Sequence, residues 1–313
     1  MYEKIFFSVV FGVLFSFPAY GCLNGDTKEL ANGEPLYQDY YGYVPYGHEF
    51  GGKERLNILL LSLKQGYQKN KDVDYLSDQG YVLILLGKYQ EAIDLYKNIE
   101  LTHPNRYSTA SNMGTAYELI GNNKEALEWI QKSVKISSKS HFYSEWIHVN
   151  ILKAKIKGEK HVTSNSLIEQ DFGKGNFPKT TLAEHTLKGL REQIYYQLNE
   201  RMSFVEPKDK IVAQLLFDLG NISYLLKDKE GANEVYELSK EYGFDDPILE
   251  KRQKLYSILT TEKVEKKIIT EVKFQAKSMR RHQLMGIFAS VLALIFSGLI
   301  IFTFRKKIIL MLK

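Results

Sequence analysis

The fold of this chain is decided by two stretches, GYVLILLGKYQEAIDLYKNIELTHP (residues 80–104) and GTAYELIGNNKEALEWI (residues 114–130). They are two copies of one unit, because small residues recur at the same places in both. Three pairs of these residues are each 34 positions apart: Gly80 and Gly114, Gly87 and Gly121, and Ala92 and Ala126. A period of this length indicates helix–turn–helix units stacked one on the next.

The residue types at the repeated positions follow from helix packing. Gly80 lies inside the first helix of its unit, where a side chain would keep the second helix away. Gly87 is expected just past the end of that helix, in a conformation with positive φ. The small Ala92 is expected where the two helices touch. Tyr96, whose counterpart is Ile130, is expected to fill the gap toward the following unit.

At these residues, over 73–140, the chain resembles the tetratricopeptide repeat (TPR) family. A further unit follows at Leu219-Gly220, Gly231-Ala232 and Tyr236, where Gly220 and Ala232 keep the spacing of the first unit. In this unit Gly87 is replaced by Asp228, after Lys227. The resemblance implies an all-α fold, a TPR-like helical solenoid of helix–turn–helix repeats. We expect the solenoid to cover residues 53–247, with a helix at 53–69 capping its start.

The pattern is weaker between the second and third units. Residues 141–157 predict one helix, in which His148 takes the place of the repeat glycine. Residues 158–179 predict a loop with a short strand or turn at Leu167–Phe172. A helix is expected to resume at Thr180 or Thr181 and to run to about Phe204.

The N-terminus predicts a signal peptide over residues 1–21. The apolar run from Ile5 to Phe17 is too short to span a bilayer. The residues that follow, Ala19-Tyr20-Gly21-Cys22, resemble a bacterial lipoprotein signal, which implies lipidation of Cys22. They depart from that pattern at Ala19, where leucine is more usual, and at the bulky Tyr20. The alternative is an ordinary signal peptide followed by a chance cysteine.

Residues 22–52 predict an irregular arm, rich in tyrosine and glycine, that lies along the first helices. Asn32-Gly33 favours a two-residue hairpin turn. Leu36-Tyr37 favours a short strand, and Pro35 and Pro45 exclude a long one.

The C-terminal part predicts a membrane anchor. Residues 248–283 are expected to form a long basic juxtamembrane helix. Residues 284–304 carry no charge, and these 21 residues would reach about 31 Å as a helix, the thickness of a bilayer core. Residues 305–313 then form a short basic tail. A homodimer through residues 248–304 is compatible with the apolar seam and the small residues of this part.

These segments together predict a single-pass protein of the bacterial inner membrane. The signal peptide places the repeat domain in the periplasm or exterior and the tail in the cytoplasm, although positive charge is at least as dense before the span as after it. The net charge of +5 comes from the residues that flank the predicted span. A nucleic-acid partner is therefore not expected.

The TPR resemblance implies a groove formed by the first helices of the units. The family's groove positions fall on nine residues of this sequence: Ser77, Tyr81, Ile84, Ser111, Thr115, Glu118, Phe217, Asn221 and Tyr224. TPR domains that clamp a C-terminal carboxylate carry Lys, Asn and Arg at these places, and only Asn221 fits. The resemblance therefore implies that a peptide or protein segment binds a mixed polar and aromatic groove.

Motifs for catalysis are sparse. The sequence has no phosphate-binding loop, dinucleotide turn, Gly-x-Ser-x-Gly or HExxH. His141, Glu145 and His148 would share one face of a helix, in a set that zinc could use. The ordinary interpretation is a helix surface with two histidines, or a His148 buried at the glycine position. No cofactor or metal is predicted, because no fourth ligand is suggested.

Three interpretations of the function follow. The first is a membrane-tethered extracytoplasmic TPR scaffold or adaptor that binds a protein or peptide partner without catalysis. The second is a sensor input module that signals through the span to a separate cytoplasmic partner, because the order of segments resembles the input half of certain bacterial TPR-containing sensor kinases. The third is a metal-dependent enzyme that uses the His/Glu/His cluster.

Overall fold

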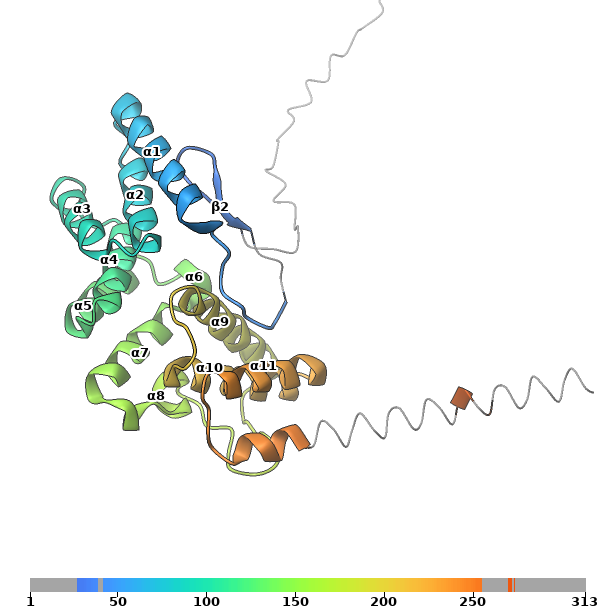
Figure 1. The fold of residues 1–313 in the computed structure, drawn as a ribbon. Helices are drawn as coiled ribbons and strands as arrows, with labels where there is room; N and C mark the ends of the chain where they lie inside the picture. Colours follow the sequence, from blue (N-terminus) through green and yellow to red (C-terminus); the bar gives the residue numbers. More distant parts are fainter. Residues whose placement is uncertain (1–26, 39–41, 255–269, 272, 274–313) are drawn as a thin grey trace, which may run out of the picture. The chain divides into compact units, whose positions relative to one another are not determined.

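The computed structural model is mainly helical over the residues that it describes, 27–38, 42–254, 270–271 and 273 (Figure 1). The chain divides into two compact units, Met1–Leu249 and Glu250–Lys313. Within the described residues, no helix is both long enough and apolar enough to cross a bilayer. Cys22 and the predicted signal peptide, span and tail lie outside those residues, as does most of the predicted juxtamembrane helix.

Helix–turn–helix pairs form where the repeats are predicted. They are α2 (Val73–Leu85) with α3 (Tyr89–Thr102), α4 (Tyr107–Leu119) with α5 (Asn123–Ile136), and α10 (Lys210–Leu225) with α11 (Lys229–Glu241).

A residue with positive φ follows the first helix of each pair. These residues are Gly87 (φ 74°), Gly121 (φ 82°) and Lys227 (φ 69°), as helix termination requires. The prediction that Asp228 replaces the turn glycine is wrong by one residue. Asp228 instead caps α11, because its carboxylate accepts the N–H of Gly231 at 3.0 Å.

The helices of each pair touch at the repeated glycines. A Cβ atom on the glycine would lie 2.4 Å from Tyr96 Cζ at Gly80, 2.6 Å from Ile130 Cδ1 at Gly114, and 2.5 Å from Tyr236 Cδ1 at Gly220. The alanines Ala92, Ala126 and Ala232 are at most 1% exposed. These contacts leave no room for a larger residue at the helix crossing.

Tyr96 reaches the following pair, as expected, and also packs within its own pair. Its ring covers Gly80 of its own pair rather than only the gap to the next one. Its hydroxyl donates to the carbonyl oxygen of Ser77 and accepts from the amide of Asn112, each at 2.9 Å. One buried side chain thus links α2 and α3 to α4 of the following pair.

The segment between the second and third pairs differs most from the prediction. The expected helix 141–157 is α6 (Ser140–Tyr143) followed by α7 (Glu145–Lys157). The segment begins with a 3₁₀ turn, η1 (Glu159–His161), and a short helix, α8 (Ser164–Ile168), which Thr163 caps. No strand forms at the predicted Leu167–Phe172, because its first two residues end α8 and residues 169–172 belong to no helix or strand. The next helix, α9, spans Glu184–Met202 and begins later than predicted, because the Thr180 hydroxyl accepts the Leu182 N–H in a local turn.

The arm begins with a hairpin of β1 (Thr27–Glu29) and β2 (Pro35–Gln38), which pair antiparallel. The predicted strand at Leu36-Tyr37 is confirmed. The two-residue turn is wrong, since the loop is longer and is closed by the bond from Leu30 N–H to the Glu34 carbonyl at 2.9 Å. The hairpin is tied to α1 (Gly52–Asn70) because Arg55 Nη1 donates to the carbonyls of Leu36 and Phe50 at 3.0 and 2.8 Å.

The apolar core has two main clusters. One joins the hairpin to α1 through α5, and the other joins α7, α8, α9, α10 and α11. Because α7 contributes Val149 and Leu152 to the first cluster and Ile147 and Ile151 to the second, it forms the link between them. Glu145 and His148, two buried polar residues of α7, lie at this link.

Candidate binding site

Two adjoining cavities are lined by residues of α2, α4, α6, α7 and α9. The larger measures about 220 Å³ and the smaller about 190 Å³. The arm adds Lys28 and Tyr37 to the lining of the smaller cavity. Both cavities share the residues Tyr81, Ser111, Asn112, His141 and Glu200.

The nine groove positions implied by the TPR resemblance fall into two groups. Those of the first two units, namely Ser77, Tyr81, Ile84, Ser111, Thr115 and Glu118, all line one cavity or both. Those of the third unit lie elsewhere. Phe217 stacks on Phe244 at 4.2 Å, Asn221 is buried and accepts a hydrogen bond from Tyr236, and the Tyr224 ring is 6.3 Å from that of Phe177. The structure therefore does not bring the third group to the cavities.

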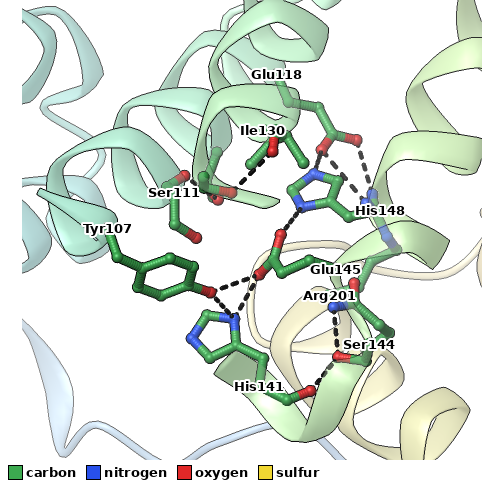
Figure 2. Close-up of polar contacts among 12 residues, drawn as sticks. Tyr107, Ser111, Glu118, Ile130, His141, Ser144, Glu145, His148 and Arg201 are labelled. Atoms are coloured by element: carbon green, nitrogen blue, oxygen red, sulfur yellow. Dashed lines mark hydrogen bonds and ion pairs between the residues drawn. The ribbon is translucent and has the colours of Figure 1, made fainter. Parts of the chain in front are cut away.

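Glu118 is the centre of a buried ionic cluster (Figure 2). Its carboxylate accepts from Lys155 Nζ at 2.7 Å, Arg201 Nη1 at 2.8 Å and His148 Nε2 at 2.7 Å. Burial alone would raise the pKa of Glu118, but the charge of Arg201, with His148 and Lys155, holds it well below its usual range. The cluster joins α4, α7 and α9 through one side chain.

Glu145 organises a second cluster on the same cavity wall. Its Oε1 accepts from the Tyr107 hydroxyl at 3.1 Å and pairs with His141 Nδ1 at 2.5 Å, as Figure 2 shows. Burial raises the pKa of Glu145, but the hydrogen bond and charge of His141 outweigh burial and lower it. Burial likewise lowers the pKa of His141, and the bond to Glu145 outweighs that effect and raises it.

Glu200 connects the arm to α9. Its Oε1 lies 3.4 Å from His48 Nε2, and the adjacent Asn199 accepts the backbone N–H groups of Tyr46 and Gly47 at 3.1 and 3.2 Å. Burial raises the pKa of Glu200, but the hydrogen bond from His48 and the nearby histidine charges outweigh it and lower the pKa. The arm thus reaches α9 as well as the first helices along which it was expected to lie.

Sequence reasoning missed the contributions of His48, Tyr107, Lys155, Glu200 and Arg201. For Arg201 a signal was present. Leu187, Leu190, Ile194 and Leu198 form the buried face of α9, and Arg201 continues that face by three residues. A charged residue on a buried face indicates a buried partner, which here is Glu118, 83 positions away in the sequence.

The predicted His/Glu/His set converges, but not on one helix. The helix begins at Glu145, so His141 comes from the preceding turn. His148 pairs with Glu118, and its Nδ1 is 3.8 Å from Glu145 Oε2. Over the described part of the chain, no group of three or more His, Cys, Asp or Glu is arranged to hold a metal ion.

The turn that carries His141 is left-handed. His141, Phe142 and Tyr143 have φ of 52°, 53° and 62°, a conformation that costs a non-glycine residue about 1–2 kcal/mol. His141 is held in place because its ring stacks on that of Tyr196, with the ring centroids 5.0 Å apart, and because it pairs with Glu145. Backbone strain of this kind concentrates at functional sites.

We expect Tyr143→Gly to stabilise the protein by about 0.5–1 kcal/mol, because glycine adopts positive φ without steric cost. Tyr143 is 55% exposed, so little packing is lost. Urea denaturation measures the effect. Lys139→Gly is the matched control, because Lys139 is exposed with φ −92° and should gain nothing. A loss of stability in Tyr143→Gly would contradict the left-handed turn.

Part of the chain matches the model of a known protein family. Residues 108–140 match the model of the tetratricopeptide repeat. The chain carries a TPR unit. The match covers α4 and α5 and therefore includes Ser111, Thr115 and Glu118 of the cavity wall. The TPR resemblance drawn from the sequence is confirmed for this unit.

The chain also matches solved structures, among them MamA, residue 41 to the end, from Desulfovibrio magneticus RS-1. It is 15% identical, with 60% of this chain and 85% of that chain covered, at a TM-score of 0.31. A TPR protein from Parabacteroides merdae ATCC 43184 is 15% identical, with 65% and 78% covered, at a TM-score of 0.32. A thermophilic TPR protein from Thermus thermophilus is 12% identical, with 66% and 92% covered, at a TM-score of 0.33. No curated protein matches this chain.

Proposed function

We propose that this protein is a membrane-tethered, extracytoplasmic TPR scaffold that holds a protein or peptide partner at the two cavities. In this proposal residues 53–247 are the TPR-like solenoid and residues 22–52 the arm. Residues 248–283 lead to a single span at 284–304 and a short tail at 305–313. The partner is recognised through binding, and no catalytic step is part of the proposal.

One observation carries the binding role. Six groove positions, taken from two consecutive units, line two cavities that adjoin each other. Binding sites of proteins are typically concave, and both cavities offer polar side chains together with the ring of Tyr81. Residues 108–140 match the tetratricopeptide repeat. Because the TPR resemblance implies peptide binding, this match supports the same role.

The tether is supported by the sequence. Residues 284–304 are 21 residues without charge, enough to cross a bilayer core as a helix. The apolar run Ile5–Phe17 has the length of a signal-peptide core. A translocated N-terminal domain with a span near the C-terminus gives the proposed topology.

Photo-crosslinking in cells tests the binding site. We expect a benzophenone amino acid in place of Tyr81, which lines both cavities, to capture a discrete partner on irradiation. The matched control replaces Tyr67, which lies on α1. Capture at Tyr67 but not at Tyr81 would place the partner on another surface.

The same cells test the tether. Protease added to spheroplasts should digest the repeat domain while a tag fused after Lys313 stays protected. A protected repeat domain with a digested tag would reverse the proposed topology, and recovery of the whole protein from the supernatant of lysed cells would exclude the span.

A further inference from the structure

The smaller cavity has the chemistry of a cation site. Tyrosine rings attract cations through their negative faces, and carboxylates add charge-assisted hydrogen bonds. Both kinds of group line this cavity: Tyr37, Tyr81, Tyr107, Tyr196, Asp78 and Glu200.

The two carboxylates of this cavity differ in their partners: Glu200 lies 3.4 Å from His48 Nε2, whereas Asp78 has no ion pair within the described residues. Asp78 accepts the N–H of Ala31 at 2.6 Å, and among the described residues no lysine or arginine forms an ion pair with it. Burial raises the pKa of Asp78, more than the Ala31 bond and the charge of Lys28 lower it. In the adjoining cavity Glu145 is 3% exposed, yet its Oε2 atom accepts no hydrogen bond. Buried polar atoms of this kind normally have a partner.

An anionic ligand would meet the opposite situation. The cations of the larger cavity, Lys155 and Arg201, are both bonded to Glu118. An incoming carboxylate or phosphate would therefore have to displace a buried carboxylate from its own partners, which is costly. Lys28 and His141 also line the smaller cavity. His141 is paired with Glu145, and Asp78 forms no ion pair with Lys28, so the Asp78 carboxylate can accept a cation of the ligand.

We propose that the smaller cavity receives a lysine or arginine side chain of the bound partner, with Asp78 and Glu200 as its anionic contacts and tyrosines as its walls. This inference rests on the proposed function. The volume agrees with one side chain, because about 190 Å³ is smaller than the roughly 300 Å³ at which sites for drug-sized ligands begin.

Calorimetry with short capped peptides tests the proposal on the full chain. The probes are acetyl-Gly-Ser-X-Ser-Gly-amide, with X as Lys, Arg, Gln or Glu. The Lys and Arg peptides should bind about tenfold or more tightly than the Gln peptide, because hydrogen bonds to charged groups are the stronger ones. The Glu peptide should be the weakest. Free butylammonium is the remaining probe, and it should bind less well than the Lys peptide if the occupant is part of a chain.

Variants locate the binding. Asp78→Asn and Glu200→Gln keep side-chain shape and should each weaken the Lys peptide about tenfold. The matched controls are Asp74→Asn on α2 and Glu192→Gln on α9, which line neither cavity and should change nothing. Lys28→Gln should strengthen binding or leave it unchanged, because Lys28 lines the same cavity and competes for the same carboxylates. General damage to the fold would instead weaken binding in all three cavity variants.

The outcomes separate this inference from the proposed function. Equal affinity for the Lys and Gln peptides, preference for the Glu peptide, tighter binding of butylammonium, or no effect of Asp78→Asn and Glu200→Gln would each overturn the cation site. If crosslinking at Tyr81 still captures a partner in those cases, the scaffold stands and only the ligand chemistry is wrong. A protein that binds no peptide and captures nothing at Tyr81 would refute both.

Discussion

Glu118→Gln should lower the free energy of unfolding by about 3–5 kcal/mol, the usual cost of removing one partner from a buried ion pair. The Glu118 side chain is 6% exposed and that of Arg201 is 9% exposed. The substitution keeps the shape of the side chain and leaves the buried Arg201 without its carboxylate partner. Urea denaturation of the two proteins at neutral pH gives the difference. The matched control, Glu159→Gln, breaks a solvent-exposed pair with Lys210 and should leave the midpoint nearly unchanged.

The pH dependence gives this prediction a second readout. The folded pKa of Glu118 lies well below the usual 4.5, so its contribution to stability is complete above the unfolded pKa and is lost as pH falls through the folded one. The difference in the free energy of unfolding between wild type and Glu118→Gln should therefore be constant above about pH 5 and shrink in more acidic solution. A difference that does not change with acid, or that is absent at neutral pH, would mean that Glu118 is not the centre of a buried cluster.

The repeat positions could be predicted from the sequence because they depend on local contacts. A glycine at a helix crossing and a residue of positive φ after the helix each have one physical cause, and both recur after 34 residues. This is why Gly80 and Gly87 locate α2, its turn and α3. The same register also placed Tyr81 and Glu118 on the cavity wall, because both lie on the first helix of their units.

The rest of the site depends on contacts that no local pattern encodes. Arg201 meets Glu118 only because the chain between the units folds back through α7 and α9. The left-handed turn at His141 contains no glycine or asparagine that would indicate it in the sequence. For the third unit, repeat spacing gives the position of Phe217 within its own pair. The same spacing does not predict how α6 through α9 position that pair in space. It therefore could not predict that the groove positions of the third unit lie away from the cavities.

Gly80→Ala should lower the free energy of unfolding by about 1–3 kcal/mol, the usual cost of overpacking a core. The added methyl group would lie 2.4 Å from Tyr96 Cζ and 2.7 Å from its hydroxyl oxygen. The ring is fully buried, and its hydroxyl is bonded to Ser77 and Asn112. The ring therefore cannot yield without breaking the link between the first two repeats.

Two further variants show whether the close approach is the cause. Gly189→Ala, in α9, places the same methyl group where no atom lies within 4 Å, so it should stabilise the protein by about 0.5–1 kcal/mol. Tyr96→Leu removes the ring that the new methyl group would meet. Combined with Gly80→Ala it should give a loss smaller than the sum of the two single losses, because the two positions are in contact. A gain in Gly80→Ala like that in Gly189→Ala, or strict additivity with Tyr96→Leu, would contradict the packing of α2 against α3 at this glycine.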